Sequence, residues 1–462
     1  MTPAADLVVA GAELLVTMTG EEIAGGWVAI DDGVVAAVGP PGSEPDARTC
    51  IRADGCLVTP GLVNTHHHMF QNLTRAFAPA VGSDVVPWVA ALGPMWEALD
   101  EEASFVSTWV ALAELALGGC TTSADHLYVH PRPRLLDAQI AAARELGMRF
   151  HPVRGAQDVP HEDGNPLPTA LTEQLDEILA DNERLVAAHH DRDPAAMVRI
   201  ALGPCTTFDS SPRLFAEVAA QAERLDVRLH THLAQAKEEE PFVRERHGRT
   251  PFEHFEAVGW ASDRAWVAHC IFPDDAEIER LARWGTAVAH CPSSNMILVG
   301  HAPPVTAMRA AGVPVGLGCD GSSSADHGSL WLEARTALLL ARLRGGPSAM
   351  TARTALRMAT VDAAACLGRA GELGVLAPGA CGDVAVWSLS GPAFAGAWTD
   401  PVEAWIRCGP VSARDTIVAG RPLVRDHRVA HPALEERLRR HAEISQSWQR
   451  RAGLSARGPR PL

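Results

Sequence analysis

The stretch Pro60-Gly-Leu-Val-Asn-Thr-His-His-His-Met-Phe-Gln71 decides how the rest of the chain is interpreted. A mostly apolar run over residues 57–63 leads into polar residues and three consecutive histidines. Side chains alternate between the two faces of a strand, so His66 and His68 are predicted to point the same way and His67 the opposite way. Two imidazoles so placed can bind one metal ion, although three histidines in a solvated loop would give the same pattern.

Outward from this stretch, the chain repeats a strand-like apolar run, a loop and a helical stretch. The later apolar runs cover residues 120–128, 148–154, 198–204, 227–233, 264–270, 286–292 and 313–320. Together with the first run they give eight strand–helix alternations, the pattern of a (β/α)₈ TIM-like barrel. We therefore predict an α/β fold with the barrel over residues 60–371. Its active site would lie at the C-terminal ends of the strands.

Both ends of the chain read as short strands and turns. Residues 1–59 are too few for a core of their own, and a similar block follows at residues 372–427. We predict that the two blocks pair into one small β-sandwich domain. Residues 428–462 are predicted to form a C-terminal helix and tail that serve packing or a subunit contact.

Metal-ligand residue types stand at the ends of several predicted strands. His66 and His68 follow the first, and later strands end at His232, His269, His290 and Asp320. A single histidine at a strand end is more often a structural residue, but several at one barrel mouth indicate a metal site. Imidazoles with a carboxylate suit Zn²⁺ or Fe²⁺ and leave a position for water, whose pKa the metal lowers towards ~7.

Composition limits the class of partner. The 462 residues are 47% hydrophobic and carry a formal charge of −16, which argues against nucleic acid or an anionic membrane. No apolar run approaches the ~18 residues of a membrane span, and no signal peptide is evident. Ten cysteines without a Cys-x-x-Cys pair favour reduced thiols and a cytoplasmic location.

The same motifs resemble the amidohydrolase superfamily, in its mononuclear-metal branch of aminohydrolases and deaminases. The markers are the opening stretch, Gly118-Gly-Cys-Thr-Thr, His230-Thr-His-Leu-Ala, His290-Cys-Pro-Ser-Ser-Asn295 and Gly318-Cys-Asp-Gly. Residues 64–75, 125–128, 227–234 and 332–335 are most similar to 8-oxoguanine deaminases, and triazine hydrolases are close relatives. The resemblance covers about residues 5–425 and implies a barrel with a β-sandwich. No lysine suitable for a metal bridge stands in run 198–204, which favours one metal over two.

The resemblance also implies roles for particular residues. One divalent metal per chain, Zn²⁺ before Fe²⁺, would be held by His66, His68, His232 and Asp320. Asp320 would also take a proton from the bound water, and His269 would hydrogen-bond that water or the tetrahedral oxygen. The substrate would be contacted by Gln71, His290, Asn295, Trp88 and Tyr128, with Trp96 as a further pocket wall. Ordinary core packing is the alternative for both tryptophans.

One position departs from the family pattern. The family usually has His-Leu-Ala-Glu where this chain has His232-Leu-Ala-Gln235. The glutamate shuttles protons to the leaving group, and a Gln amide cannot act as an acid or base near pH 7. Phe70, Ile297 and Ala325 also replace the usual Tyr, Arg and Asn, and the loop after residue 154 differs. Either another acid such as Glu238 or a substrate group replaces the glutamate, or the leaving group needs no proton.

Three functions are therefore open. The first is a metal-dependent hydrolytic deaminase of an oxopurine, pterin or triazine-like ring, with an 8-oxoguanine-like oxopurine preferred and Gln235 near the reaction centre. The second is a hydrolase on the same scaffold that removes chloride or opens a cyclic amide. The third is a non-catalytic descendant, which the retained metal ligands disfavour. We also expect a small heterocyclic substrate and a homo-oligomeric protein, a dimer or larger.

Overall fold

The computed structural model describes residues 5–453 and contains the predicted barrel. Eight parallel strands form one sheet in the order β15-β14-β13-β12-β11-β10-β9-β8. Their bounds are β8 (Leu62–Asn64), β9 (Cys120–Leu127), β10 (Arg149–Ala156), β11 (Ala201–Pro204), β12 (Arg228–Leu233), β13 (Ala265–His269), β14 (Ala287–His290) and β15 (Val315–Leu317). The sheet closes where Thr65 N donates to Leu317 O at 3.0 Å. The buried Asn64 side chain helps, because it donates to Ser123 Oγ at 3.0 Å and accepts from Cys319 N at 2.9 Å.

Helices surround this barrel, and local sequence signals set their ends. The helix over Pro212–Leu225 begins with Pro212 behind Ser211, whose side chain accepts from Leu214 N. The bounds are α2 (Glu101–Leu117), α3 (Leu135–Leu146), α4 (Leu175–His189), α5 (Pro212–Leu225), α6 (Glu239–His247), α7 (Pro251–Ala257), α8 (Asp275–Trp284), α9 (Pro292–Leu298), α10 (Val305–Ala310), α11 (Leu330–Gly345), α12 (Ala352–Met358) and α13 (Val361–Cys366). Short 3₁₀ helices are η1 (Met69–Thr74), η2 (Ala78–Ala80), η3 (His161–Asp163), η4 (Thr169–Leu171) and η5 (Pro392–Phe394).

The two chain ends share one β-sandwich, as predicted. One sheet has the order β5-β4-β1-β6 and the other the order β19-β18-β17-β16-β7-β2-β3. In the second sheet β7 pairs with β2 from the N-terminal part and with β16 from the C-terminal part. The bounds are β1 (Ala5–Ala10), β2 (Leu14–Val16), β3 (Glu22–Ile23), β4 (Trp27–Asp31), β5 (Val34–Gly39), β6 (Ala47–Arg52), β7 (Cys56–Pro60), β16 (Val384–Ser388), β17 (Asp415–Val418), β18 (Arg421–Arg425) and β19 (Arg428–Val429).

The first predicted strand is in fact two strands. The run over residues 57–63 divides at Gly61, so that β7 belongs to the sandwich and β8 to the barrel. Gly61 is needed at the crossing, because a Cβ there would lie 2.1 Å from Thr121 Oγ1. The three histidines lie beyond the end of β8, so strand alternation does not by itself set their directions.

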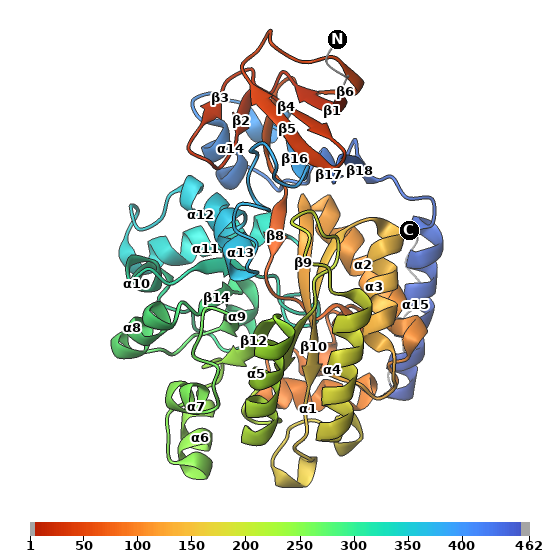
Figure 1. The fold of residues 1–462 in the computed structure, drawn as a ribbon, viewed down its shortest axis with the longest axis vertical. Helices are drawn as coiled ribbons and strands as arrows, with labels where there is room; N and C mark the ends of the chain where they lie inside the picture. Colours follow the sequence, from red (N-terminus) through yellow and green to blue (C-terminus); the bar gives the residue numbers. More distant parts are fainter. Residues whose placement is uncertain (1–4, 454–462) are drawn as a thin grey trace.

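Figure 1 shows the sandwich at the end of the barrel where the strands begin, and α1 (Val85–Trp96) at the opposite end. The C-terminal helix α15 (Leu434–Arg451) runs along the side of the barrel next to α2. It buries Trp448, and Ser445 Oγ donates to Leu73 O at 2.7 Å. The short helix α14 (Pro401–Arg407) lies at the sandwich end. Within residues 5–453, no helix is both long and apolar enough to cross a membrane.

The expectation of a homo-oligomer stays a prediction. On α11, Leu339 and Leu343 are 51% and 82% exposed, and burial of such side chains against a second copy would be favourable. We expect light scattering at micromolar concentration to give at least a dimer mass. A monomer mass would contradict this expectation.

Candidate active site

Two of the three histidines that follow β8 turn into the mouth of the barrel. His68 Nε2 lies 3.2 Å from His232 Nε2 and 3.4 Å from Asp320 Oδ1. His66 Nε2 lies 3.4 Å from the same Asp320 oxygen. His67 lies apart, and neither of its ring nitrogens has a hydrogen-bond partner among the described residues. His67 belongs to none of the groups of possible metal ligands among the described residues, so only His66 and His68 of the three reach the site.

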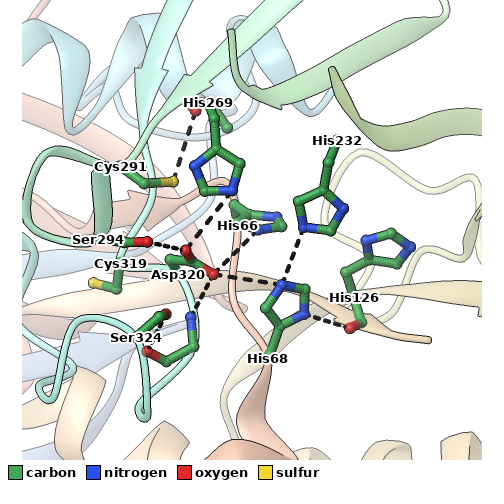
Figure 2. Close-up of polar contacts among 12 residues, drawn as sticks. His66, His68, His126, His232, His269, Cys291, Ser294, Cys319, Asp320 and Ser324 are labelled. Atoms are coloured by element: carbon green, nitrogen blue, oxygen red, sulfur yellow. Dashed lines mark hydrogen bonds and ion pairs between the residues drawn. The ribbon is translucent and has the colours of Figure 1, made fainter. Parts of the chain in front are cut away.

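The remaining members come from the ends of β12, β13 and β15. His232 is the residue before the last of β12, and His269 is the last residue of β13. Asp320 lies in the loop after β15. Figure 2 shows these side chains pointing towards one another with His66 and His68. The ring nitrogens of His66, His232 and His269 lie within 4.8 Å of one another, as do the ligand atoms of His66, His68 and Asp320.

Hydrogen bonds on the far side of each ring direct its other nitrogen into the cluster. His68 Nδ1 donates to His126 O at 2.7 Å, and His232 Nδ1 donates to Cys205 O at 2.8 Å. His269 Nδ1 donates to Asn295 Oδ1 at 2.8 Å. Each ring therefore presents the lone pair of Nε2 to the centre, the arrangement that outer partners impose on metal-binding histidines.

His66 is oriented by a second histidine. His230 Nδ1 donates to Trp266 O at 2.9 Å, so its Nε2 must accept from His66 Nδ1 at 2.7 Å. This leaves the lone pair of His66 Nε2 facing the cluster. His66, His126 and His230 also lie close enough to hold an ion, but this chain of hydrogen bonds already uses the facing nitrogens of His66 and His230. We interpret His230 as a support for His66.

The cluster has the properties that a divalent metal requires. Burial lowers the pKa of His66 and His232 well below the usual range and lowers that of His68 and His269, which keeps the imidazoles neutral. The Nε2 atoms of His66 and His269 are buried and have no partner among the described residues. Four neutral imidazoles and one carboxylate fit Zn²⁺ or Fe²⁺, so the residues present suit the group.

The backbone at the strand ends is strained. Ala234, His269 and Asp320 all have positive φ, at 51°, 70° and 61°. Residues other than glycine rarely adopt this region, at a cost of roughly 1–3 kcal/mol each. Asp320 is held there by Gly321 N, which donates to its Oδ1 at 2.6 Å, and by Ser294 Oγ, which donates to its Oδ2.

A pocket opens over the cluster, with about 690 Å³ of atom-free space, part of it open to solvent. We call it the main pocket. It is lined by His68, Gln71, Val85, Val86, Trp88, Val89, Tyr128, Pro166, Cys205, Thr206, Phe208, Asp209, His232, Gln235, Ala236, Glu239, Leu298, Asp320 and Ser324. Helix α1 thus supplies an apolar wall. Among residues 5–453, no lysine or arginine lines this pocket, which argues against a phosphate or carboxylate substrate.

Three of the predicted substrate contacts line the main pocket. Gln71 Nε2 donates to Tyr128 Oη at 3.1 Å, and Trp88 stands on α1. The Oε1 atom of Gln71 is buried without a partner among the described residues and could accept from a ring N–H. Gln71 packs directly on the turn after Asp320, because a Cβ at Gly321 would lie 1.7 Å from its Oε1.

Other predicted residues lie elsewhere. Asn295 stands behind His269 as its hydrogen-bond acceptor and is not among the residues that line the main pocket. His290 lines a separate pocket beside α10 and α11, and burial lowers its pKa to about 3. Trp96 is fully buried against Phe70. Ile297 is half exposed.

Sequence reasoning missed one acidic residue. Glu238, which the sequence offers as an alternative acid, is exposed, whereas Glu239 is 3% exposed and lines the main pocket. The run Glu238-Glu239-Glu240 opens α6, and the residue types alone do not tell which of the three carboxylates turns inward. His230 was also missed as a support, although its i, i+2 spacing to His232 was a signal.

A (β/α)₈ barrel with such a cluster at its C-terminal mouth defines a metal-dependent hydrolase. The sequence pattern of the amidohydrolase family matches residues 57–422. An 8-oxoguanine deaminase of Pseudomonas aeruginosa is 42% identical over 430 residues, which cover 92% of this chain and 95% of that protein. This chain belongs to the amidohydrolase family. It is an enzyme, which confirms the expected class of hydrolase acting on C–N bonds.

Two further similarities concern triazines and zinc. A hydroxydechloroatrazine ethylaminohydrolase of Pseudomonas sp. strain ADP is 37% identical over 392 residues, which cover 81% of this chain and 81% of that protein. The structure of an atrazine chlorohydrolase from Arthrobacter aurescens TC1, complexed with zinc, superposes with a TM-score of 0.91 at 31% identity. That alignment covers 95% of this chain and 100% of the other.

Proposed function

We propose that this chain is a metal-dependent hydrolytic deaminase that removes an amino group from a nitrogen heterocycle, with an 8-oxoguanine-like oxopurine as the preferred substrate. The main support for this proposal is that the histidine–aspartate cluster forms part of the wall of the main pocket, through His68, His232 and Asp320. The 42% identity to an 8-oxoguanine deaminase supports the choice of ring.

We assign a separate role to each residue of the site. His66, His68, His232 and Asp320 would hold one divalent ion, preferably Zn²⁺, which when bound activates water for attack on the ring carbon. Asp320 would accept a proton from the attacking water, and His269 Nε2, whose lone pair faces the cluster, would accept a hydrogen bond from that water. Gln71, Trp88 and Tyr128 would orient the ring. Asn295 would act through His269, to whose Nδ1 it is hydrogen-bonded, whereas His290, the last residue of β14, lines the separate pocket.

The test of this proposal is ammonia release. Purified protein would be incubated with 8-oxoguanine, a pterin and an aminotriazine, with His269→Ala as the inactive reference. We expect ammonia from at least one ring, and most rapidly from the oxopurine. Absence of ammonia from every ring would contradict deamination.

Gln235 favours a second candidate function. An anionic leaving group such as chloride needs no proton, so a hydrolase of that kind would lose nothing by having glutamine at position 235. The structural similarity to an atrazine chlorohydrolase supports this alternative. Chloride release from a chlorotriazine, without ammonia release from any ring, would favour it.

Gln235→Glu distinguishes the two functions. In a deaminase the new carboxyl adds a positioned acid in the main pocket, a kind of group that contributes ~10²–10⁴-fold to proton transfer, so ammonia release should rise. In a hydrolase with an anionic leaving group, the added charge should give no deamination and slow the native reaction. Unchanged rates on every substrate would mean that Gln235 does not face the reaction centre.

A further inference from the structure

Removal of an amino group requires an acid that the main pocket does not supply at position 235. The amino group is a poor leaving group until its nitrogen gains a proton, and the Gln235 amide cannot supply that proton. The other titratable side chains that line the main pocket are His68, Tyr128, Cys205, Asp209, His232, Glu239 and Asp320. His68, His232 and Asp320 belong to the metal cluster.

Three of the remaining groups are poorly suited to donate. Burial raises the pKa of Tyr128 and of Cys205 well above the usual range, which makes both very weak acids. Asp209 is a weaker candidate than Glu239, because burial raises its pKa only to about 6 and its carboxylate accepts three hydrogen bonds, from Thr206 N at 2.9 Å and Ser210 Oγ at 2.7 Å on Oδ1 and from Thr206 Oγ1 at 2.7 Å on Oδ2. Glu239, whose carboxylate accepts two hydrogen bonds, is therefore the best suited of these side chains to donate a proton.

Glu239 has the position and the surroundings of an acid. Its Oε2 accepts from Gln235 N at 3.1 Å and its Oε1 accepts from Thr207 Oγ1 at 3.3 Å. Gln235 is thus held directly beside it. Burial raises the pKa of Glu239 to about 7, so the carboxyl is partly protonated at neutral pH.

Glu239 also reaches a second pocket on the outer side. This outer pocket is lined by Ala234, Ala236, Lys237, Glu239, Glu240, Pro251, Phe252, Phe272 and Glu277. Glu239 therefore stands between the main pocket and a hollow from which its proton can be replaced.

We propose that Glu239 donates the proton that the leaving nitrogen requires. The inference rests on the proposed deaminase function. The water oxygen forms a bond to the ring carbon, and the C–N bond breaks with its electron pair on nitrogen, which takes the proton of Glu239. One hydrogen of the water ends on the ring nitrogen of the oxo product, and the other is taken by Asp320 and passes to solvent. Glu239 regains a proton from solvent through the outer pocket, so that ammonia is released and both carboxyl groups are unchanged.

Several groups face Glu239 and enter any pH dependence. Asp209 faces it from the loop after β11, and Cys270 from the end of β13. Lys237, Glu240 and Glu277 share the outer pocket with it. The carboxylates of Asp209, Glu240 and Glu277 favour the protonated form of Glu239, and Lys237 opposes it. Burial raises the pKa of the Cys270 thiol well above its usual range and so keeps it uncharged.

The test compares Glu239→Gln with Glu238→Gln, a matched control at the exposed neighbour. Glutamine can still accept from Gln235 N, so the metal content and melting temperature should be unchanged. We expect Glu239→Gln to lower kcat for ammonia release by ~10²–10⁴-fold and Glu238→Gln to leave it unchanged. The wild-type rate should fall above a pH of about 7, where Glu239 loses its proton, and this fall should be absent in Glu239→Gln.

Two further measurements separate catalysis from structure. Thr207→Val removes a donor to the Glu239 carboxylate and should move the alkaline fall of kcat to higher pH. Gln235→Glu in the Glu239→Gln background should restore part of kcat, because it returns an acid to the same wall. A lowered melting temperature with unchanged kcat, or an equal loss in Glu238→Gln, would overturn the proposal.

An infrared titration of the carboxylic-acid band measures the protonation of Glu239 without a substrate, so it tests this inference independently of the proposed function. A carboxylic-acid band with a midpoint near 7 should be present in the wild type and absent in Glu239→Gln. If the wild type released no ammonia from any ring, the proposed function would fail first and the donor role would fall with it. If ammonia is released but the band is absent, only the role of Glu239 is overturned.

Discussion

His68→Ala should remove most of the divalent metal from the purified protein and abolish most of its activity. His68 Nε2 is central to the cluster, at 3.2 Å from His232 Nε2 and 3.4 Å from Asp320 Oδ1. Changing even an outer partner of a metal ligand typically costs ~10–100-fold in affinity or activity, so loss of the ligand itself should exceed this range. Elemental analysis of wild-type protein should give close to one ion per chain.

His67→Ala is the matched control for this experiment. His67 is a neighbour in sequence and equally buried, yet it contributes no atom to the three groups of possible metal ligands. Its removal should destabilise the fold through the cavity that it leaves, with the metal retained. Two ions per chain, or wild-type occupancy in His68→Ala, would contradict the mononuclear site.

The barrel and the histidine–aspartate cluster at its mouth were predictable because each depends on a repeated pattern. Apolar runs recur at intervals that fit strand–helix units, and parallel strands bring their C-terminal ends to one face. Histidine or aspartate stands at five of those ends, and the side chains at four of them, namely His66 and His68, His232, His269 and Asp320, meet in one cluster. His290 at the fifth end lines a separate pocket, because a strand end fixes the position of a residue but not the direction of its side chain. Hydrogen-bond partners such as Cys205 O could not be predicted, because backbone carbonyls carry no sequence signal.

The pocket was less predictable than the cluster, because loops and helix starts set its walls. Positions 238 and 239 hold the same residue type, so the sequence does not distinguish them. The position at which α6 begins determines that Glu239, and not Glu238, lines the main pocket. Asn295 has an amide suited to a heterocycle, but its Oδ1 is engaged by His269. The division of the first strand at Gly61 depends on contact with Thr121, which lies far along the chain.

Deletion of residues 1–50 should leave an insoluble protein. The deletion removes β2 and β3, so that β7 becomes an unpaired edge of the sheet that it shares with β16. It also uncovers an apolar face, because Val58 and Val386 pack in one core with Leu7, Val28 and Ile30. An exposed hydrophobic edge strand is a template for aggregation, so the chain should collect in the pellet.

Point variants test the same idea without truncation. Val58 is fully buried at the centre of β7, and Val58→Asp would place a charge in this core, at a cost of several kcal/mol. Thr49→Asp, on the exposed face of β6, is the control and should remain soluble and metal-loaded. Sedimentation and metal content after expression would measure both variants and the deletion. A soluble, metal-loaded deletion would show that the barrel folds without its N-terminal strands, since the remaining sandwich strands would then tolerate the lost partners.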